Sequence, residues 1–356
     1  TVSALSVAAN TVAFANNTQI ISIEEVSEYA TIWNNATKKM ILVGVNEPNA
    51  ISKKTITAFA KEESVVVLTE TTSNVHHETF INTIDTIITP FTEEDFEYFR
   101  PEILVTFGGM VVSKRIKTFL RKYKPKHHWH IDPWRAYDTF GALTKHFEVT
   151  PNVFFDAFLP LTNATESNYF QQLNAVKVLR KLKSDFYLSK IPFSDFKVFE
   201  KVIQRLPMNS QLQISNSSAI RYAQLIDIDP SIDVYCNRGT SGIDGSTSTA
   251  IGAAVANKKQ TIFITGDISF LYDSNALWNN YIPKNFKIIL LNNSGGGIFR
   301  ILPGHQETET FNTYFETSHH LNASHLAKMY GLDYFEANDE ITLQQQYSAF
   351  LNQNEK

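Results

Sequence analysis

The chain has 356 residues, 43% hydrophobic and 19% charged, with a formal net charge of −4, which is typical of a globular protein with room for two domains. No basic block points to nucleic acid, and the single cysteine, Cys236, excludes an internal disulfide and a cysteine-rich zinc site. No apolar run is long enough to span a membrane and no signal peptide is evident, so we expect a cytoplasmic protein without membrane insertion.

The first part of the chain alternates strands and helices. Residues 1–38 lack a clear period and are interpreted as a connector with one short helix. The alternation that follows is typical of a parallel sheet, so residues 39–155 are predicted to form a central Rossmann-like domain. Its strands are expected at 41–44, 65–68, 103–107 and 127–131, with helices at 51–61 and 113–123.

The turn after the third strand carries Gly108 and Gly109. It is not a dinucleotide fingerprint, because the three-glycine spacing and a suitably placed acidic residue are missing. The helix that follows begins with Lys114 and Arg115. Since the helix dipole disfavours cations in the first turn, their placement favours anion binding over a merely solvated face.

Residues 156–207 are predicted to be a helical bridge, with helices at 168–183 and 196–206, and a second α/β domain follows over 208–356. The expected fold class is α/β, with two doubly wound, Rossmann-like domains whose sheets are mainly parallel. In the second domain we expect strands at 211–215, 233–236, 261–265, 287–291 and 334–335, and helices at 219–226, 246–256, 323–330 and 341–354.

The most informative stretch runs from 261 to 300. One buried strand ends on Gly266-Asp267, a helical segment follows, and a second buried strand ends on Asn292-Asn293. Asp267 and Asn293 lie 26 positions apart (293 minus 267), which is the length of one β-α-β unit. Parallel strands present their carboxyl ends at the same sheet edge, where ligands bind, so the two side chains are expected to converge there.

A carboxylate, an amide oxygen and a nearby backbone carbonyl are hard oxygen ligands that suit Mg²⁺ or Mn²⁺. The glycines at 295–297 allow backbone to approach a ligand closely. The helix after Asp267 points its N-terminus at the same place, which favours a diphosphate. The alternative to a metal and diphosphate site is an ordinary β-α-β unit with a polar loop.

This pattern resembles the diphosphate-binding motif of thiamine diphosphate enzymes, in which Gly-Asp is followed one β-α-β unit later by Asn-Asn. Together with four further segments, it resembles the SEPHCHC synthase family (2-succinyl-5-enolpyruvyl-6-hydroxy-3-cyclohexene-1-carboxylate synthases of menaquinone biosynthesis). The segment 237–245 is the most diagnostic, and the others are 113–115, 216–221 and 298–303.

The resemblance implies a thiamine diphosphate-dependent transferase that decarboxylates 2-oxoglutarate and adds the succinyl unit to isochorismate, working as a homodimer or homotetramer. It also implies three domains, of which this chain matches the central and diphosphate-binding ones. The N-terminal pyrimidine-binding domain, with the glutamate that acts on the cofactor ring, has no counterpart here, so the fragment alone is expected to be inactive.

For the cofactor, the resemblance implies that Asp267, Asn293 and the carbonyl of Gly295 hold the divalent ion. Ile243 matches the apolar residue that wedges between the two rings and holds the cofactor bent. The residues implied to cradle the diphosphate are Gly266, Ile268, Ser269, Asn293, Gly295 and Gly296.

Both substrates are anionic, and the planar fork of arginine suits carboxylates, so the site needs fixed cations. The resemblance places Ser217 and Arg221 at the succinyl carboxylate, and it counts them with Arg238 and Ile243 as catalytic. The other implied substrate residues are the cations Lys114, Arg115 and Arg238 and an apolar wall of Ile298, Phe299 and Leu302.

Several alternatives remain open. Arg221 could be a surface residue, Arg238 could pair with Asp244, and the apolar residues at 298–302 could be plain core. The diphosphate motif is shared with other thiamine diphosphate 2-oxoacid lyases and synthases, such as acetolactate synthase-like enzymes and decarboxylases. A non-enzymatic module that binds a nucleotide or phosphate at the sheet edge is a third hypothesis, and the cations favour an enzyme with anionic substrates.

Overall fold

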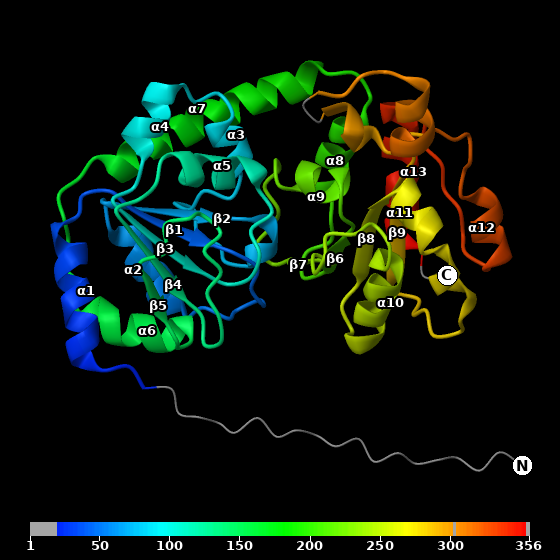
Figure 1. The fold of residues 1–356 in the computed structure, drawn as a ribbon. Helices are drawn as coiled ribbons and strands as arrows, with labels where there is room; N and C mark the ends of the chain where they lie inside the picture. Colours follow the sequence, from blue (N-terminus) through cyan, green and yellow to red (C-terminus); the bar gives the residue numbers. More distant parts are fainter. Residues whose placement is uncertain (1–19, 302–303, 354–356) are drawn as a thin grey trace, which may run out of the picture.

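The computed structural model describes residues 20–301 and 304–353, which form two parallel sheets with helices on both faces of each (Figure 1). The predicted α/β fold class is confirmed. The strands of the first sheet are β1 (Lys39–Val43), β2 (Val65–Thr69), β3 (Ile103–Phe107), β4 (His127–Ile131) and β5 (Lys145–Phe147). Those of the second are β6 (Gln211–Ile214), β7 (Asp233–Cys236), β8 (Thr261–Gly266) and β9 (Phe286–Leu291).

The first sheet has the order β2-β1-β3-β4-β5, and every neighbouring pair is parallel. Strands β1, β2 and β3 are buried along their whole length, because helices cover both faces of the sheet and no face is left for polar side chains. One face packs against α1 (Ile23–Asn35), α2 (Lys53–Lys61) and α6 (Pro151–Phe158). The other packs against α3 (Ile84–Ile88), α4 (Glu93–Phe99), α5 (Lys114–Lys122) and the start of α7 (Tyr169–Lys190).

Helix α1 corrects the prediction of a connector over residues 1–38. Val26, Ala30 and Trp33 recur at helical spacing and are buried in the same core as β1, so this helix belongs to the first domain. Residues 1–19 of the predicted connector lie outside the described residues.

The strand order of the first sheet reverses between β1 and β3, the position where doubly wound folds bind ligands. Here the two loops fill the crevice themselves. Gly44 N–H donates to the carbonyl of Phe107 at 2.8 Å, and Gly109 N–H donates to the carbonyl of Val45 at 2.8 Å. A Cβ on Gly44 would meet the Gly109 oxygen at 2.0 Å. This packing agrees with the missing dinucleotide fingerprint.

The second sheet has the parallel order β7-β6-β8-β9 and reverses between β6 and β8. The ends of these two strands are therefore the expected ligand site. One face packs against α8 (Asp195–Ile203), α9 (Ser218–Ala223) and α13 (Glu340–Asn352). The other packs against α10 (Ser246–Ala256), α11 (Asp267–Tyr272) and α12 (Ser324–Met329).

The strand predicted at 334–335 is wrong. This segment has no regular structure and lies across a groove of about 550 Å³ from β9. Phe335 packs against α13 instead, where its ring lies 5.9 Å from that of Phe350, while Tyr334 is exposed. Helix α7 runs to Lys190, beyond the predicted end at 183, because no helix breaker precedes Pro192.

The two sheets meet through Asn74, which follows β2. Its side-chain amide donates to the Val234 carbonyl at 2.9 Å and its oxygen accepts the Val234 N–H at 2.9 Å. The side chain thus pairs with the free edge of β7 as a neighbouring strand would. This contact places the carboxyl edge of the first sheet against the second domain (Figure 1).

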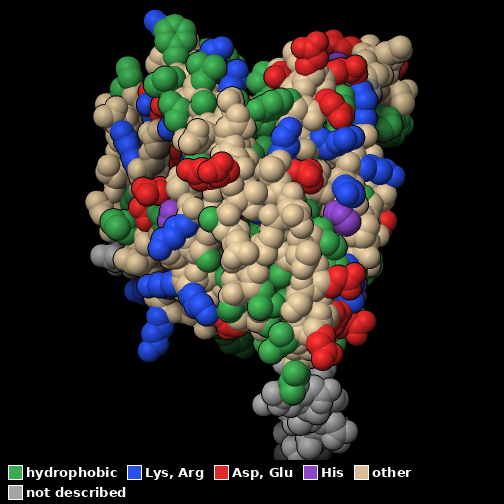
Figure 2. Space-filling view, turned by 90° about the vertical axis from the view of Figure 1, so that its left-hand side faces the viewer, with side chains coloured by type: hydrophobic (Ala, Val, Ile, Leu, Met, Phe, Trp, Pro, Cys, Tyr) green, Lys and Arg blue, Asp and Glu red, His purple; other side chains and the backbone are tan. Residues whose placement is uncertain are grey.

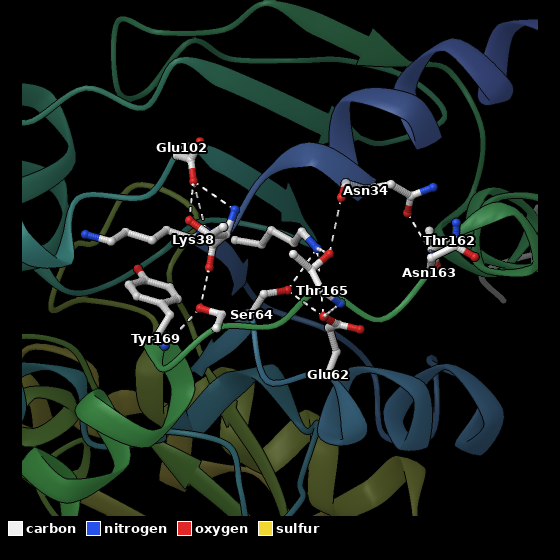
Figure 3. A network of polar contacts seen from close by, with 12 residues as sticks. Asn34, Lys38, Glu62, Ser64, Glu102, Thr162, Asn163, Thr165 and Tyr169 are labelled. Carbon is white, nitrogen blue, oxygen red and sulfur yellow. Dashed lines mark hydrogen bonds and ion pairs between the residues drawn. The ribbon is translucent and has the colours of Figure 1, made fainter.

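A polar network ties the opposite, amino edge of the first sheet to the segment before α7 (Figure 3). Glu102 Oε1 accepts the backbone N–H groups of Thr37 at 2.8 Å and Lys38 at 3.1 Å. The buried Lys39 Nζ donates to Ser64 at 2.8 Å and to Thr165 at 3.0 Å. These bonds fix where β1 begins.

The face that lies at the left of Figure 1 carries small separate groups of basic and acidic side chains, with no continuous basic surface (Figure 2). Within residues 20–301 and 304–353, no helix combines the length and the apolar character that crossing a membrane requires.

Candidate functional site

Asp267 lies at the end of β8, at the strand reversal of the second sheet. It is the first residue of α11 and is 4% exposed. Its Oδ1 accepts the N–H of Ile268 at 2.7 Å, and its Oδ2 accepts the N–H of Gly295 at 2.9 Å. The structure therefore brings the loop after β9 to the end of β8, as the β-α-β spacing predicts.

The glycines of this loop pack tightly against the π-helical segment Phe311–Glu316. Gly295 has φ 153°, and a Cβ there would meet the Glu316 carbonyl oxygen at 2.8 Å. Gly296 N–H donates to the same oxygen at 2.6 Å. Arg300 then bonds the Glu316 carboxylate through Nε at 2.6 Å, so both sides of the loop are held. Only glycine permits this approach of two backbones.

Asn293 is exposed, and its side-chain amide donates to Asp195 Oδ2 at 2.7 Å. Burial raises the pKa of Asp195, the Asn293 hydrogen bond lowers it, and the negative charge of Asp267 raises it further. Two carboxylates and an amide thus gather at the ends of β8 and β9.

This acidic grouping fits a divalent cation in the kind of ligands it offers. The described residues contain no group of three or more His, Cys, Asp or Glu side chains placed to hold a metal. The predicted metal ligands do not form such a group, because they are one carboxylate (Asp267), one amide oxygen (Asn293) and one backbone carbonyl (Gly295). In this structure the Asn293 amide is engaged by Asp195.

His319 also lies at Asp267, although it is not among the site residues predicted from the sequence. Its Nε2 is 3.2 Å from Asp267 Oδ2, while its Nδ1 accepts the Leu321 N–H at 3.1 Å. Because Nδ1 is an acceptor, we assign the ring proton to Nε2, which lies beside the carboxylate but makes no hydrogen bond among the described residues. The His319 N–H donates to the Ser294 carbonyl at 3.1 Å, so this segment is tied to the glycine loop. No pattern in the sequence links residues so far apart.

The loop 237–245 lies over the same strand ends. Ser269 Oγ donates to the carbonyl of the half-buried Ile243 at 2.6 Å. Asn216, which is 2% exposed, donates from its side-chain amide to the Gly242 carbonyl at 2.6 Å and to the Asn237 carbonyl. Asn216 was not among the predicted site residues, although it opens one of the diagnostic segments.

Ser217 and Arg221 come together at the start of α9. Ser217 has φ 71° and ψ −129°, an unusual conformation for a residue other than glycine and one that is often found at functional sites. Its carbonyl accepts from Arg221 Nη1 at 2.6 Å. Burial and the nearby charge of Arg238 lower the pKa of Arg221. Arg221 is therefore half-buried in a cationic setting and is not a plain surface residue.

Arg238 bonds Asn216 Oδ1 through Nη1 at 3.2 Å, whereas the Asp244 carboxylate accepts the Gly245 N–H. The buried Nε of Arg238 has no hydrogen-bond partner among the described residues. A buried unpaired donor beside a second guanidinium fits the binding of an anion.

Lys114 and Arg115 are exposed in the first turn of α5. Lys117, one turn later, joins them. Burial lowers the pKa of Lys117, the charge of Glu70 raises it, and the charge of Arg238 lowers it. The first turns of α5 thus lie near the arginines of the second domain, and Lys117 follows Lys114 at the i+3 spacing that marks one helix face.

The predicted apolar wall is partly packed. Ile298 and Phe299 are half-buried in the 3-10 helix Gly297–Ile301, and the Phe299 ring lies 5.8 Å from that of Phe315. Leu302 lies outside the described residues.

Comparison with known proteins agrees with this geometry. The middle-domain model of thiamine pyrophosphate enzymes matches residues 13–214, and the C-terminal TPP binding domain model matches residues 217–356.

The chain is 66% identical over 334 residues to the 2-succinyl-5-enolpyruvyl-6-hydroxy-3-cyclohexene-1-carboxylate synthase of Flavobacterium johnsoniae, which covers 94% of this chain and 60% of that relative. It is 63% identical over 347 residues to the synthase of the same name from Flavobacterium psychrophilum, covering 98% of this chain and 63% of that relative. The chain thus spans about three fifths of the length of these curated relatives.

On the strength of the domain models, the chain belongs to the thiamine pyrophosphate enzymes, of which it carries the middle and the C-terminal cofactor-binding domains.

Proposed function

We propose that the chain is the middle and cofactor-binding part of a SEPHCHC synthase. The reaction is the decarboxylation of 2-oxoglutarate and the addition of its succinyl unit to isochorismate. The names of the relatives support this assignment. The observation that carries it is the contact of Gly295 with Asp267 at the strand reversal, with a cationic surface from both domains close by.

The cofactor side of the proposal concerns the ends of β8 and β9. Asp267, Asn293 and the Gly295 carbonyl would hold Mg²⁺ or Mn²⁺, and the loop 293–297 with Ser269 would hold the diphosphate. Thiamine diphosphate supplies the electron sink for decarboxylation when it is bound. The hydrogen bond from Ser269 to Ile243 fixes the loop that would support the two rings.

The substrate side consists of the cations Lys114, Arg115, Lys117, Arg221 and Arg238. They would bind and orient the carboxylates through planar or ammonium donors that carry positive charge. Ser217 would add a hydroxyl next to Arg221, and Ile298 and Phe299 would exclude water on the apolar side.

We further propose a homo-oligomer in the cytoplasm. Sedimentation velocity and cell fractionation test these two points directly.

Calorimetry with thiamine diphosphate and Mg²⁺ tests cofactor binding, on the chain as it stands and on Asp267→Ala. We expect binding by the parent chain and at least a tenfold loss in the variant, since a charged ligand is removed. The matched control is Asp333→Ala, an exposed carboxylate of the same domain that accepts the Gln353 side-chain amide at 2.6 Å. Equal binding by parent and Asp267→Ala would refute the cofactor assignment.

Substrate choice is tested in a polypeptide with the full length of the curated relatives. We expect release of CO₂ from 2-oxoglutarate that depends on isochorismate. A preference for pyruvate would favour another thiamine diphosphate lyase or synthase instead.

A further inference from the structure

We infer that Glu70 and Asp85 are positioning residues of the substrate site: these two carboxylates hold the start of α5, and with it Arg115 and Lys117, toward Arg221 and Arg238 of the second domain. The inference rests on the proposed function for the identity of the anion. The hold on α5 itself can be measured independently.

Glu70 joins the end of β2 to the start of α5. It is 3% exposed, and its two carboxylate oxygens accept the N–H of Val112 at 2.6 Å and the N–H of Ser113 at 2.7 Å. Its own N–H donates to Ser73 Oγ at 2.8 Å, and that hydroxyl donates to the Val43 carbonyl at 2.7 Å. The residue is thus anchored to the first sheet while it binds the helix with two charge-assisted hydrogen bonds.

Asp85, in α3, holds the same helix start through a side chain. Its carboxylate accepts the hydroxyl of Ser113, and that hydroxyl in turn accepts the N–H of Ile116 at 3.1 Å as the N-cap of α5. Ser113 is therefore held twice, by Glu70 at its backbone and by Asp85 at its side chain.

Asp85 also interacts electrostatically with both domains. Burial raises its pKa, the Ser113 hydrogen bond lowers it, and the positive charges of Arg115 and Arg221 lower it further. One carboxylate thus interacts with a cation of α5 and with a cation of α9.

The arrangement accounts for cations at a helix N-terminus, where the helix dipole repels them. The neighbouring Lys117 and Arg238 repel each other as well. The two carboxylates offset that repulsion, because Glu70 interacts with Lys117 and Asp85 interacts with Arg115.

Ionising the buried carboxylate of Glu70 destabilises the folded state, which a purely structural role would not require. Burial raises the pKa of Glu70 to about 7, the two backbone hydrogen bonds lower it, the charge of Asp85 raises it, and the charge of Lys117 lowers it. The pKa of Glu70 in the folded state lies above its ordinary value of 4.5, so the folded state binds the proton more tightly than the unfolded state. The contribution of Glu70 to the free energy of unfolding should therefore fall as the pH rises from 4.5 to about 7. A buried carboxylate with such a cost, beside a cationic site, is typical of a functional position.

The test is an NMR titration of the Val112 and Ser113 amides in the 356-residue chain. In the parent chain both amide protons are expected to shift together with a midpoint near pH 7. Glu70→Gln should abolish this titration, and Asp85→Asn should lower its midpoint. Amides that do not titrate, or that titrate unchanged in Glu70→Gln, would overturn the inference.

The functional consequence is measured as 2-oxoglutarate affinity from the shifts of the Arg115 and Lys117 amides. Glu70→Gln and Ser113→Ala should each weaken binding roughly tenfold. Glu102→Gln is the matched control, because Glu102 also accepts two backbone N–H groups, at the far edge of the same sheet (Figure 3). Unchanged affinity in folded Glu70→Gln and Ser113→Ala would contradict the positioning role. No binding by the parent chain, with a normal amide titration, would instead count against the proposed substrate.

Discussion

The backbone N–H of Gly295 donates to the carboxylate of Asp267 across 2.9 Å, and this bond joins the loop after β9 to the end of β8. The two strands are paired from Thr261 and Phe286 to Gly266 and Leu291, so the polar residues that follow them emerge side by side. The cofactor binding proposed for this chain depends on this contact between the loop after β9 and the end of β8.

Gly295→Ala should displace the loop after β9 and weaken the Gly295–Asp267 hydrogen bond. The added Cβ would meet the Glu316 carbonyl at 2.8 Å, and φ 153° is unfavourable for alanine. We expect the free energy of unfolding to fall by about 1–3 kcal/mol and thiamine diphosphate binding to weaken. Thermal melting and calorimetry measure both.

Gly252→Ala is the control for that substitution. Gly252 lies within α10 with nothing within 4 Å of the added Cβ, so stability should stay the same or rise by up to about 1 kcal/mol. An equal loss in both variants would show that the Gly295 loop has no special constraint.

His319→Ala should weaken Mg²⁺-dependent cofactor binding about tenfold, because its Nε2 lies 3.2 Å from Asp267 Oδ2 and its ring packs beside that carboxylate. His320→Ala is the matched control, since the neighbouring ring is exposed. Binding is measured by calorimetry at fixed pH. If both substitutions have the same effect, His319 has no specific part in the site.

Asn74→Ala should loosen the contact between the two domains. The side chain makes two hydrogen bonds of 2.9 Å to the backbone of Val234. Their loss should lower the free energy of unfolding by about 1–3 kcal/mol and separate the unfolding of the two domains in calorimetry.

The control is Asn152→Ala, which loses two bonds to backbone groups within the first domain, those with Ser52 and Ala50. It should not separate the two transitions. A single cooperative transition in Asn74→Ala, as in the parent chain, would contradict the coupling role.

The buried Lys39 should make the free energy of unfolding increase as the solution becomes alkaline. Burial lowers its pKa to about 8, while the charges of Glu62 and Glu102 raise it. Its folded pKa lies below the ordinary 10.5, so the unfolded chain binds more protons between these values. The free energy of unfolding should therefore increase with pH from about 8 to 10.5.

Lys39→Met should remove this increase and leave neutral-pH stability the same or higher, by up to about 3 kcal/mol. Urea unfolding over that pH range measures it. A pH dependence identical to that of the parent chain would show that Lys39 is not the group responsible.

The sequence predicts the parts of the fold that depend on local pattern. Buried β-branched runs identify β8 and β9, and their spacing places Asp267 near the loop after Asn293. The pattern is misleading for the aromatic residues at 334–335, because the Phe335 ring packs against α13 and does not belong to a strand. It also misses β5, because three residues are too few to show a period.

The candidate site is predictable only where a motif lies within a short segment. Contacts between distant segments leave no such trace. Glu70 meets Val112 and Ser113 from another part of the chain, and His319 reaches Asp267 from an irregular segment. These contacts depend on tertiary packing, which periodicity and spacing do not encode.

The most direct test is a crystal structure of the chain with thiamine diphosphate and Mg²⁺. The account predicts one ion about 2.1 Å from a carboxylate oxygen of Asp267, the amide oxygen of Asn293 and the carbonyl oxygen of Gly295. The Asn293 side-chain nitrogen, which donates to Asp195 at 2.7 Å, leaves the amide oxygen to the ion. A bound cofactor whose ion lies away from Asp267, with Asn293 not among its ligands, would contradict the assignment.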